Sequence, residues 1–173
     1  LIWGGGPRRG EMVEADASAE AVAFMGELCR RVGEHGTCFC FEPLGPEDSD
    51  FINSALDSLR IVEMVDHPAL RVQLDAKALV ENDEAEIGLF QAVAARLVHF
   101  HANEPGLGVL GESGAVDHAA MGRMLRDIDY AGFVSIEQRI LNQADPLSGV
   151  RRSAEVAIAC YGDVRGPADG PRA

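Results

Sequence analysis

Four apolar runs in this chain each end in a residue that can bind a metal ion. The four residues are Glu42, Asp75, His101 and Glu137. Three carboxylates in one pocket would repel one another and force at least one to stay protonated, whereas a divalent cation removes that conflict. Oxygen ligands with one imidazole suit Mn²⁺, Mg²⁺, Co²⁺ or Zn²⁺, and the ligand types alone do not choose among these ions. Because a polar residue is also an ordinary end to a strand, a metal site requires that the four side chains converge.

The elements that must position these residues alternate between strands and helices. After an apolar stretch at the amino end, we expect strands at 37–42, 70–75, 96–101 and 132–137, and helices at 19–32, 54–65, 87–94, 121–128 and 148–160. This alternation is typical of parallel βαβ units, which build either a doubly wound sheet or a (β/α)8 barrel. The sequence has no GxGxxG segment that opens a helix after a strand, which disfavours a dinucleotide-binding sheet. In both folds the carboxyl ends of the strands gather at one edge, so we expect the four residues to meet there.

The run LVHFHANEPG, residues 97–106, contains two histidines that are two positions apart. Alternate residues of a strand share a face, so His99 and His101 point the same way and Phe100 points the opposite way. His101 is nearer the end of the strand and can reach a metal ion. We therefore expect His99 to lie behind the metal ligands or in the core.

The acidic balance of the chain limits its partners. A net charge of −13, from 28 Asp and Glu against 15 Lys and Arg, repels phosphate backbones and anionic membrane surfaces. The sequence contains no apolar run long enough to span a membrane and no segment of the type that directs export. The cysteines, Cys29, Cys38, Cys40 and Cys160, show no CxxC spacing. We therefore expect a cytoplasmic protein with reduced thiols, without a nucleic-acid or membrane partner.

Three segments make the chain recognisable: CFEPLGPEDSDFINSALDSLRIVEMVDHPALRVQLDAKAL, HFHANEPG and GFVSIEQR. With the order Glu, Asp, His, Glu across successive strands, they resemble the xylose-isomerase-like TIM-barrel superfamily of sugar isomerases and epimerases. The resemblance covers about residues 1–155 and implies an incomplete (β/α)8 barrel of about five βα units, equivalent to strands 4 to 8. It implies a partial barrel domain at 1–160, and we expect a disordered tail at 161–173 because that segment lacks apolar periodicity.

The resemblance also implies a chemistry. It makes Glu42, Asp75, His101 and Glu137 the ligands of a divalent metal ion, and Glu42 and Glu137 the acid–base pair. The implied reaction is reversible proton transfer at a carbon beside a carbonyl, through an enediolate, as in a sugar isomerase or epimerase. The implied substrate is a sugar, a sugar phosphate or a keto-polyol. Open sheet edges in an incomplete barrel would also allow a homo-oligomer.

The sugar pocket departs from the family pattern more than the metal ligands do. Ala78 stands where ketose epimerases have a histidine, Leu107 where they have an arginine, and Asp48 where they have a further glutamate. The substrate is therefore not specified by the sequence. The residues available to bind its polar groups are Asp48, Lys77, Asn103 and Arg139.

Two other functions remain open at the level of the sequence. The NEP segment at 103–105 matches an acid–base motif of retaining glycoside hydrolases, which need two carboxylates about 5 Å apart. That function would leave Glu42 and Asp75 without a role. The other alternative is a truncated or degenerate barrel without catalytic activity.

Overall fold

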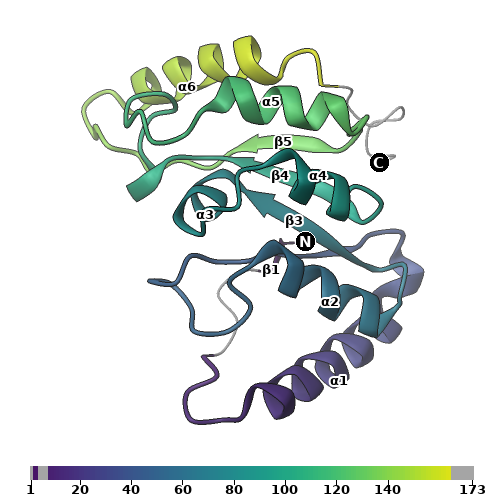
Figure 1. The fold of residues 1–173 in the computed structure, drawn as a ribbon. Coiled ribbons are helices and arrows are strands. Elements are labelled where there is room, and N and C mark those ends of the chain that lie inside the picture. The colour runs from purple at the N-terminus through teal and green to yellow at the C-terminus, as the bar shows by residue number, and fades with distance from the viewer. Residues whose placement is uncertain (1, 4–7, 165–173) are drawn as a thin grey trace.

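Five parallel strands form the sheet in a computed structural model that describes residues 2–3 and 8–164 (Figure 1). They are β1 (Ile2–Trp3), β2 (Phe39–Phe41), β3 (Leu70–Asp75), β4 (Leu97–Ala102) and β5 (Phe133–Ile136). Each strand pairs in parallel with the next one along the chain, so the spatial order is β1-β2-β3-β4-β5. A doubly wound sheet reverses its strand order at a switch point, whereas a barrel wall does not. The predicted incomplete barrel is therefore confirmed.

The helices lie in one layer beside the sheet (Figure 1). The α-helices are α1 (Glu14–Val32), α2 (Ala55–Val65), α3 (Ala76–Glu81), α4 (Ile87–Val93), α5 (His118–Asp127) and α6 (Pro146–Tyr161), with short 3₁₀ turns at Gly33–His35 and Pro105–Leu107. Helix α1 packs on α2, α2 on α4, α4 on α5, and α5 on α6. Within residues 2–3 and 8–164, no helix combines the length and apolarity needed to cross a membrane.

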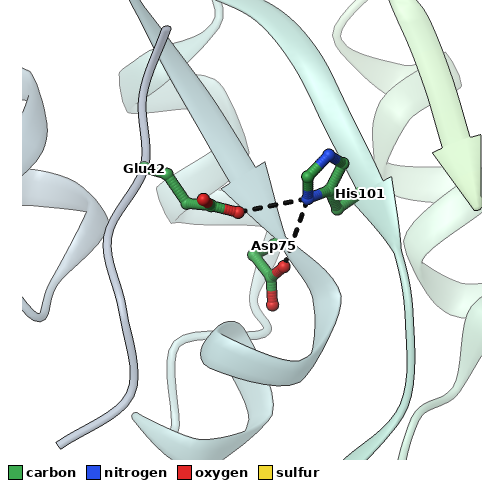
Figure 2. A group of neighbouring side chains, drawn as sticks. All are labelled: Glu42, Asp75 and His101. Atoms are coloured by element: carbon green, nitrogen blue, oxygen red, sulfur yellow. Dashed lines mark ion pairs between the residues drawn. The ribbon is translucent and has the colours of Figure 1, made fainter. Parts of the chain in front are cut away.

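The four residues of the predicted metal site lie within one residue of the ends of their strands. Asp75 is the last residue of β3, and His101 is the next to last of β4. Glu42 and Glu137 directly follow β2 and β5. Because Asp75 is the parallel partner of His101, their side chains leave the sheet at the same level. Figure 2 shows that three of these side chains, from neighbouring strands, point toward one another.

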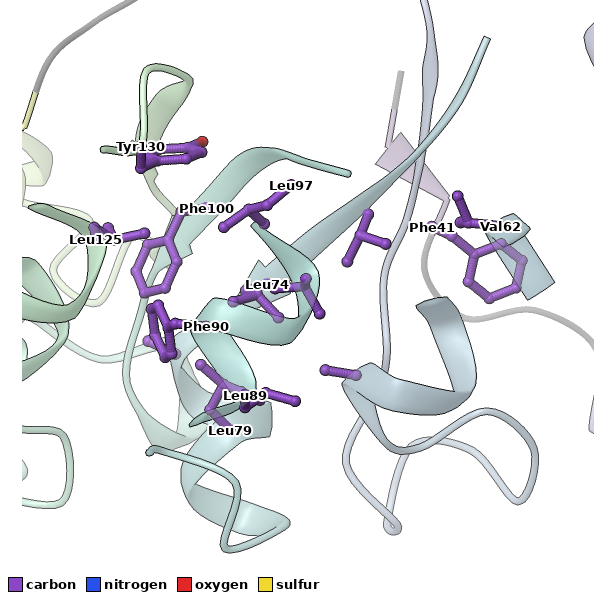
Figure 3. Packing of buried hydrophobic residues seen from close by; sticks show 14 of the residues in the cluster. Phe41, Val62, Leu74, Leu79, Leu89, Phe90, Leu97, Phe100, Leu125 and Tyr130 are labelled. Carbon is purple, nitrogen blue, oxygen red and sulfur yellow. The ribbon is translucent and has the colours of Figure 1, made fainter. Parts of the chain in front are cut away.

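The hydrophobic core lies between the sheet and the helix layer (Figure 3). Leu74 and Phe100 are paired across β3 and β4, and both are fully buried. Phe90 of α4 packs against Phe100 with ring centroids 6.3 Å apart. Burial of a side chain of this size stabilises the fold by about 1.5–3 kcal/mol. The core therefore holds β3 and β4, which carry Asp75 and His101, in a fixed register.

The other face of the sheet is lined by a different set of side chains. Gln73 and His99 alternate with core residues along β3 and β4, so they point away from the helices. A cavity of about 640 Å³ on this side is bordered by Cys40, His99 and Phe133. Phe133 is 49% exposed, which is unusual for a residue in a parallel strand. The inner face of the barrel wall is thus exposed at its β5 edge, whereas Gln73 on β3 is fully buried.

The structure differs from the sequence prediction in three main places. Helix α1 begins at Glu14, five residues before the predicted start. Helix α3 was not predicted, because Asp75 both ends β3 and caps the next helix by accepting a hydrogen bond from the Ala78 N–H at 2.9 Å. Tyr161, the first residue of the expected tail, is the last residue of α6 and is buried. The rest of that prediction falls largely on residues 165–173, which lie outside the described residues.

Candidate metal centre

Three side chains from three adjacent strands meet at the carboxyl end of the sheet. Glu42, Asp75 and His101 each offer one ligand atom, and these atoms lie within 4.8 Å of one another (Figure 2). The distance from His101 Nδ1 is 3.1 Å to Glu42 Oε1 and 3.6 Å to Asp75 Oδ2. All three side chains are almost completely buried. The sheet therefore assembles three of the four predicted ligands into one compact group.

Glu137 approaches the same histidine from the opposite flank. Its Oε2 atom is 3.5 Å from His101 Nδ1, and its side chain is 43% exposed. The strand order places Glu42 on β2 and Glu137 on β5, with Asp75 and His101 between them. The two glutamates thus lie on opposite flanks of Asp75 and His101.

The electrostatics of this group suit a cation. Burial raises the pKa of Glu42, and the charges of Asp75 and Glu137 raise it further against the opposing effect of His101. Burial would lower the pKa of His101, but its hydrogen bonds to Asp75 and Glu42, with the carboxylate charges, raise it to about 9. A protonated Nδ1 offers one N–H to three carboxylates, whereas a divalent cation would contact all of them. The residues present therefore fit a divalent metal ion.

Gln73 lies directly beneath this group and was not identified from the sequence. Its Nε2 atom donates to Glu42 Oε1 at 2.5 Å and lies 2.9 Å from His101 Nδ1. Its Oε1 atom is buried and has no hydrogen-bond partner among the described residues. Buried polar groups are rarely left without partners, so Gln73 Oε1 is an unsatisfied acceptor beside the candidate ligands. The signal in the sequence was the alternation along LRVQLD, which places Gln73 on the same face as Asp75.

His99 lies below His101 on the inner face of β4, as its spacing indicated. The two imidazole rings meet edge to face with their centroids 5.2 Å apart. Burial lowers the pKa of His99 to about 4, and the charge of His101 contributes to the shift. His99 is therefore neutral at pH 7 and lies outside the compact group of three ligand atoms found among the described residues.

The residues considered for substrate binding have different surroundings. Asn103 is buried and donates from Nδ2 to Asp75 Oδ2 at 2.6 Å and to Glu137 Oε2 at 2.8 Å. Lys77 Nζ forms a partly exposed ion pair with Asp48 Oδ2 at 2.7 Å. Arg139 is exposed on the segment that follows Glu137. The structure thus brings Asn103 to the carboxylates and leaves the other three at the periphery.

Glu104, the glutamate of the NEP segment, faces away from this site. It is fully buried, and its Oε1 atom accepts hydrogen bonds from the Gly111 N–H at 2.7 Å and from His118 Nε2 at 3.0 Å. Its other oxygen accepts from the Ser113 hydroxyl. Glu104 therefore holds the loop after β4 together and is closed off from solvent.

A cavity of about 420 Å³ lies between α1 and the segment that follows β2, and Glu42 of the candidate metal centre is at its border. Its walls are mostly apolar and include Phe41, Leu44 and Phe51, with Arg8 at the border. Ligand pockets in proteins commonly measure about 300–1,000 Å³. The cavity is therefore large enough for a small organic molecule next to a candidate catalytic carboxylate.

A sheet in chain order, one layer of helices and an acidic group at the strand ends define part of a (β/α)8 barrel with a candidate metal centre. The chain belongs to the xylose isomerase-like TIM barrel family, whose sequence model matches residues 1–160. A D-psicose 3-epimerase from Ruminiclostridium cellulolyticum is 28% identical over 130 residues, which are 75% of this chain and 42% of that protein. The chain thus spans less than half the length of this relative.

Two solved structures share the fold. A D-psicose 3-epimerase crystallised with D-fructose superposes with a TM-score of 0.79 at 21% identity, over 90% of this chain and 61% of that one. The IOLI protein with a bound zinc atom superposes with a TM-score of 0.70 at 15% identity, over 91% of this chain and 60% of that one. At these identities the similarity establishes the fold.

Proposed function

We propose that this chain carries the metal centre and acid–base residues of a divalent-metal-dependent sugar epimerase or isomerase. The observation that supports this most directly is the convergence of Glu42, Asp75 and His101, with Glu137 3.5 Å from the same histidine. The relative from R. cellulolyticum is an epimerase of a ketose, which supports a small sugar or keto-polyol as the substrate class. The ion would be Mn²⁺, Mg²⁺, Co²⁺ or Zn²⁺, all of which accept this ligand set.

The chemistry requires a proton to leave a carbon beside a carbonyl. A divalent cation bound by the four residues would polarise that carbonyl and stabilise the negative charge that forms on its oxygen. Glu42 is suited to act as a base or acid near neutral pH, because burial and its acidic neighbours raise the pKa of its carboxyl group. Gln73 holds Glu42 through the hydrogen bond to its Oε1 atom.

The placement of the glutamates favours epimerisation over isomerisation. Inversion at a carbon requires that one group removes a proton from one face and a second group returns a proton to the other. Glu42 and Glu137 lie on opposite flanks of Asp75 and His101, on β2 and β5. Such a facing pair can serve both faces of a substrate held between them. Glycoside hydrolysis through Glu104 is disfavoured because its carboxylate is buried and fully bonded.

Deuterium exchange tests this proposal directly. The purified chain would be freed of metal with a chelator, reconstituted with Mn²⁺ or Co²⁺, and incubated in D₂O with a panel of ketoses and keto-polyols. We expect NMR to show deuterium incorporation beside the carbonyl, together with the epimer, only in the reconstituted samples. Glu137→Gln should slow exchange by roughly 10²- to 10⁴-fold, the usual contribution of a positioned acid or base.

A matched control separates this effect from a general loss of structure. Glu112 is an exposed glutamate that pairs with Arg152 on the surface, so Glu112→Gln should exchange at the wild-type rate. Exchange that proceeds equally well without metal, or with Glu137→Gln, would rule out the proposed mechanism.

A further inference from the structure

Two consecutive residues after β4, Asn103 and Glu104, turn their side chains in opposite directions. Asn103 is 1% exposed and reaches the carboxylates of Asp75 and Glu137. Glu104 is fully buried and reaches His118 at the start of α5. We infer that Asn103 is a positioning residue that orients the Asp75 and Glu137 carboxylates for the cation, an inference that rests on the proposed function.

The amide of Asn103 uses its polar atoms in three hydrogen bonds. Its Nδ2 atom donates to Asp75 Oδ2 at 2.6 Å and to Glu137 Oε2 at 2.8 Å. Its Oδ1 atom accepts from the Lys77 N–H at 2.8 Å. An amide nitrogen has two N–H groups, so both are committed to the two carboxylates. These three partners therefore fix the orientation of the Asn103 amide. The amide in turn restrains the Asp75 and Glu137 carboxylates.

The two carboxylates depend on this amide to different extents. Asp75 is also held at Oδ1 by the Ala78 N–H, so both of its oxygens are restrained. Glu137 is 43% exposed and directly follows the end of β5, where an unrestrained side chain would sample several rotamers. The bond from Asn103 selects the rotamer in which Glu137 Oε2 lies 3.5 Å from His101 Nδ1. Asn103 thus brings the fourth predicted ligand to the other three.

The backbone around Asn103 is held from two sides. The Glu104 carboxylate is bound by Gly111 and His118, and the Glu104 carbonyl accepts from the Leu107 N–H at 2.8 Å. The Leu107 carbonyl in turn accepts from the Arg139 N–H at 3.0 Å, two residues after Glu137. The loop that carries Asn103 is therefore connected to the segment that carries Glu137.

Cobalt binding measures this role without requiring turnover. Metal-free wild-type chain would be titrated with Co²⁺, with the visible absorption bands recording both affinity and coordination geometry. Asn103→Ala should weaken Co²⁺ binding roughly 10- to 100-fold, the usual effect of removing a group that orients metal ligands. Asn103→Asp keeps the size of the side chain and the acceptor for Lys77 but loses the donor, so it should change the absorption spectrum of the saturated site.

Asn82→Ala is the matched control. The Asn82 amide also donates two hydrogen bonds, to the Asn53 carbonyl at 3.1 Å and to the Ala78 carbonyl at 2.9 Å, but contacts no carboxylate of the site. Asn82→Ala should retain wild-type affinity and spectrum.

If both Asn103 variants match wild type in affinity and spectrum, Asn103 is not a positioning residue. If Asn103→Ala does not fold, the spectrum of Asn103→Asp decides. If the wild-type chain itself binds no Co²⁺, the proposed function and this inference are both overturned.

Discussion

Two glutamate–histidine pairs among the described residues are buried, with nearly the same separation and very different surroundings. Glu42 Oε1 is 3.1 Å from His101 Nδ1, and Glu104 Oε1 is 3.0 Å from His118 Nε2. In the first pair, the carboxylates of Asp75 and Glu137 also lie within 3.6 Å of His101 Nδ1. Around the second, the carboxylate accepts from a backbone N–H and a hydroxyl, and the far side of the imidazole bonds to the Tyr161 hydroxyl at 2.7 Å.

The difference lies in the balance of donors and acceptors. The Glu104–His118 pair has as many donors as its carboxylate needs, so it stabilises the fold and requires no ligand. The Glu42–His101 pair has more negative acceptors than donors, and that imbalance is what a divalent cation removes. Contact distances alone would not have separated a structural pair from a candidate metal centre.

The largest expected effect is on turnover. We expect Glu42→Gln to lower the rate of proton exchange by roughly 10²- to 10⁴-fold, because it removes a candidate acid–base group. Glu104→Gln should change the rate per folded molecule far less, because Glu104 is closed off from solvent. Exchange rates measured by NMR on samples matched for folded fraction would check this. Equal losses of exchange rate in both variants would contradict the assignment of Glu42 to the candidate active site and of Glu104 to the fold.

The effect on stability should run in the opposite order. Glu104→Ala leaves His118 and the Gly111 N–H without their buried partner, so we expect it to lower the free energy of unfolding by about 3–5 kcal/mol. Glu42→Ala in the metal-free chain removes one of three mutually repelling carboxylates and should cost about 1 kcal/mol or less. Urea denaturation in the presence of a chelator would measure both. A larger loss of unfolding free energy in Glu42→Ala than in Glu104→Ala would contradict the expected order.

The metal-free centre should also make stability depend on pH. The pKa of His101 is about 9 in the folded chain against a usual value of 6.5, so the folded state binds the proton more tightly. This stabilisation is fully present below about pH 6.5 and is lost as the pH rises through about 9. We expect urea midpoints of the chelator-treated chain to fall between pH 6 and 9.5.

His101→Gln should remove most of that decline. Metal binding should strengthen over the same interval, because protons compete with the cation for His101. A flat midpoint in the wild-type chain would contradict the raised pKa of His101.

The smallest expected effect concerns the periphery. Lys77 and Asp48 form a partly exposed ion pair, so Lys77→Ala should change the free energy of unfolding by no more than about 1 kcal/mol. Since both residues are candidates for binding polar groups of the substrate, we expect a higher KM with metal affinity unchanged. An unaltered KM would remove Lys77 from the substrate site.

The strands and their functional ends could be predicted because their signals are local. The patterns of LRVQLD (70–75) and RLVHFH (96–101) predict β3 and β4 to within a residue, and with them the positions of Asp75 and His101. Helix α3 was not predicted because no loop separates it from β3: Asp75 is both the last residue of the strand and the N-cap of the helix. The family, and with it the incomplete barrel, could be predicted from three segments and from the order of four residues along the chain.

The sequence by itself determined which residue types stand at the ends of the strands, because strand periodicity and ligand chemistry are properties of the residues themselves. Only the tertiary structure decided how the neighbours of those residues are used. Asn103 and Glu104 are adjacent in the chain, yet Asn103 donates hydrogen bonds to the site carboxylates, whereas Glu104 is buried and hydrogen-bonded to His118. Their direction is set by the course of the loop after β4 and by their partners, which are Asp75 and Glu137 for Asn103 and His118 for Glu104. No local pattern encodes those contacts, because they form between segments that are distant in the sequence.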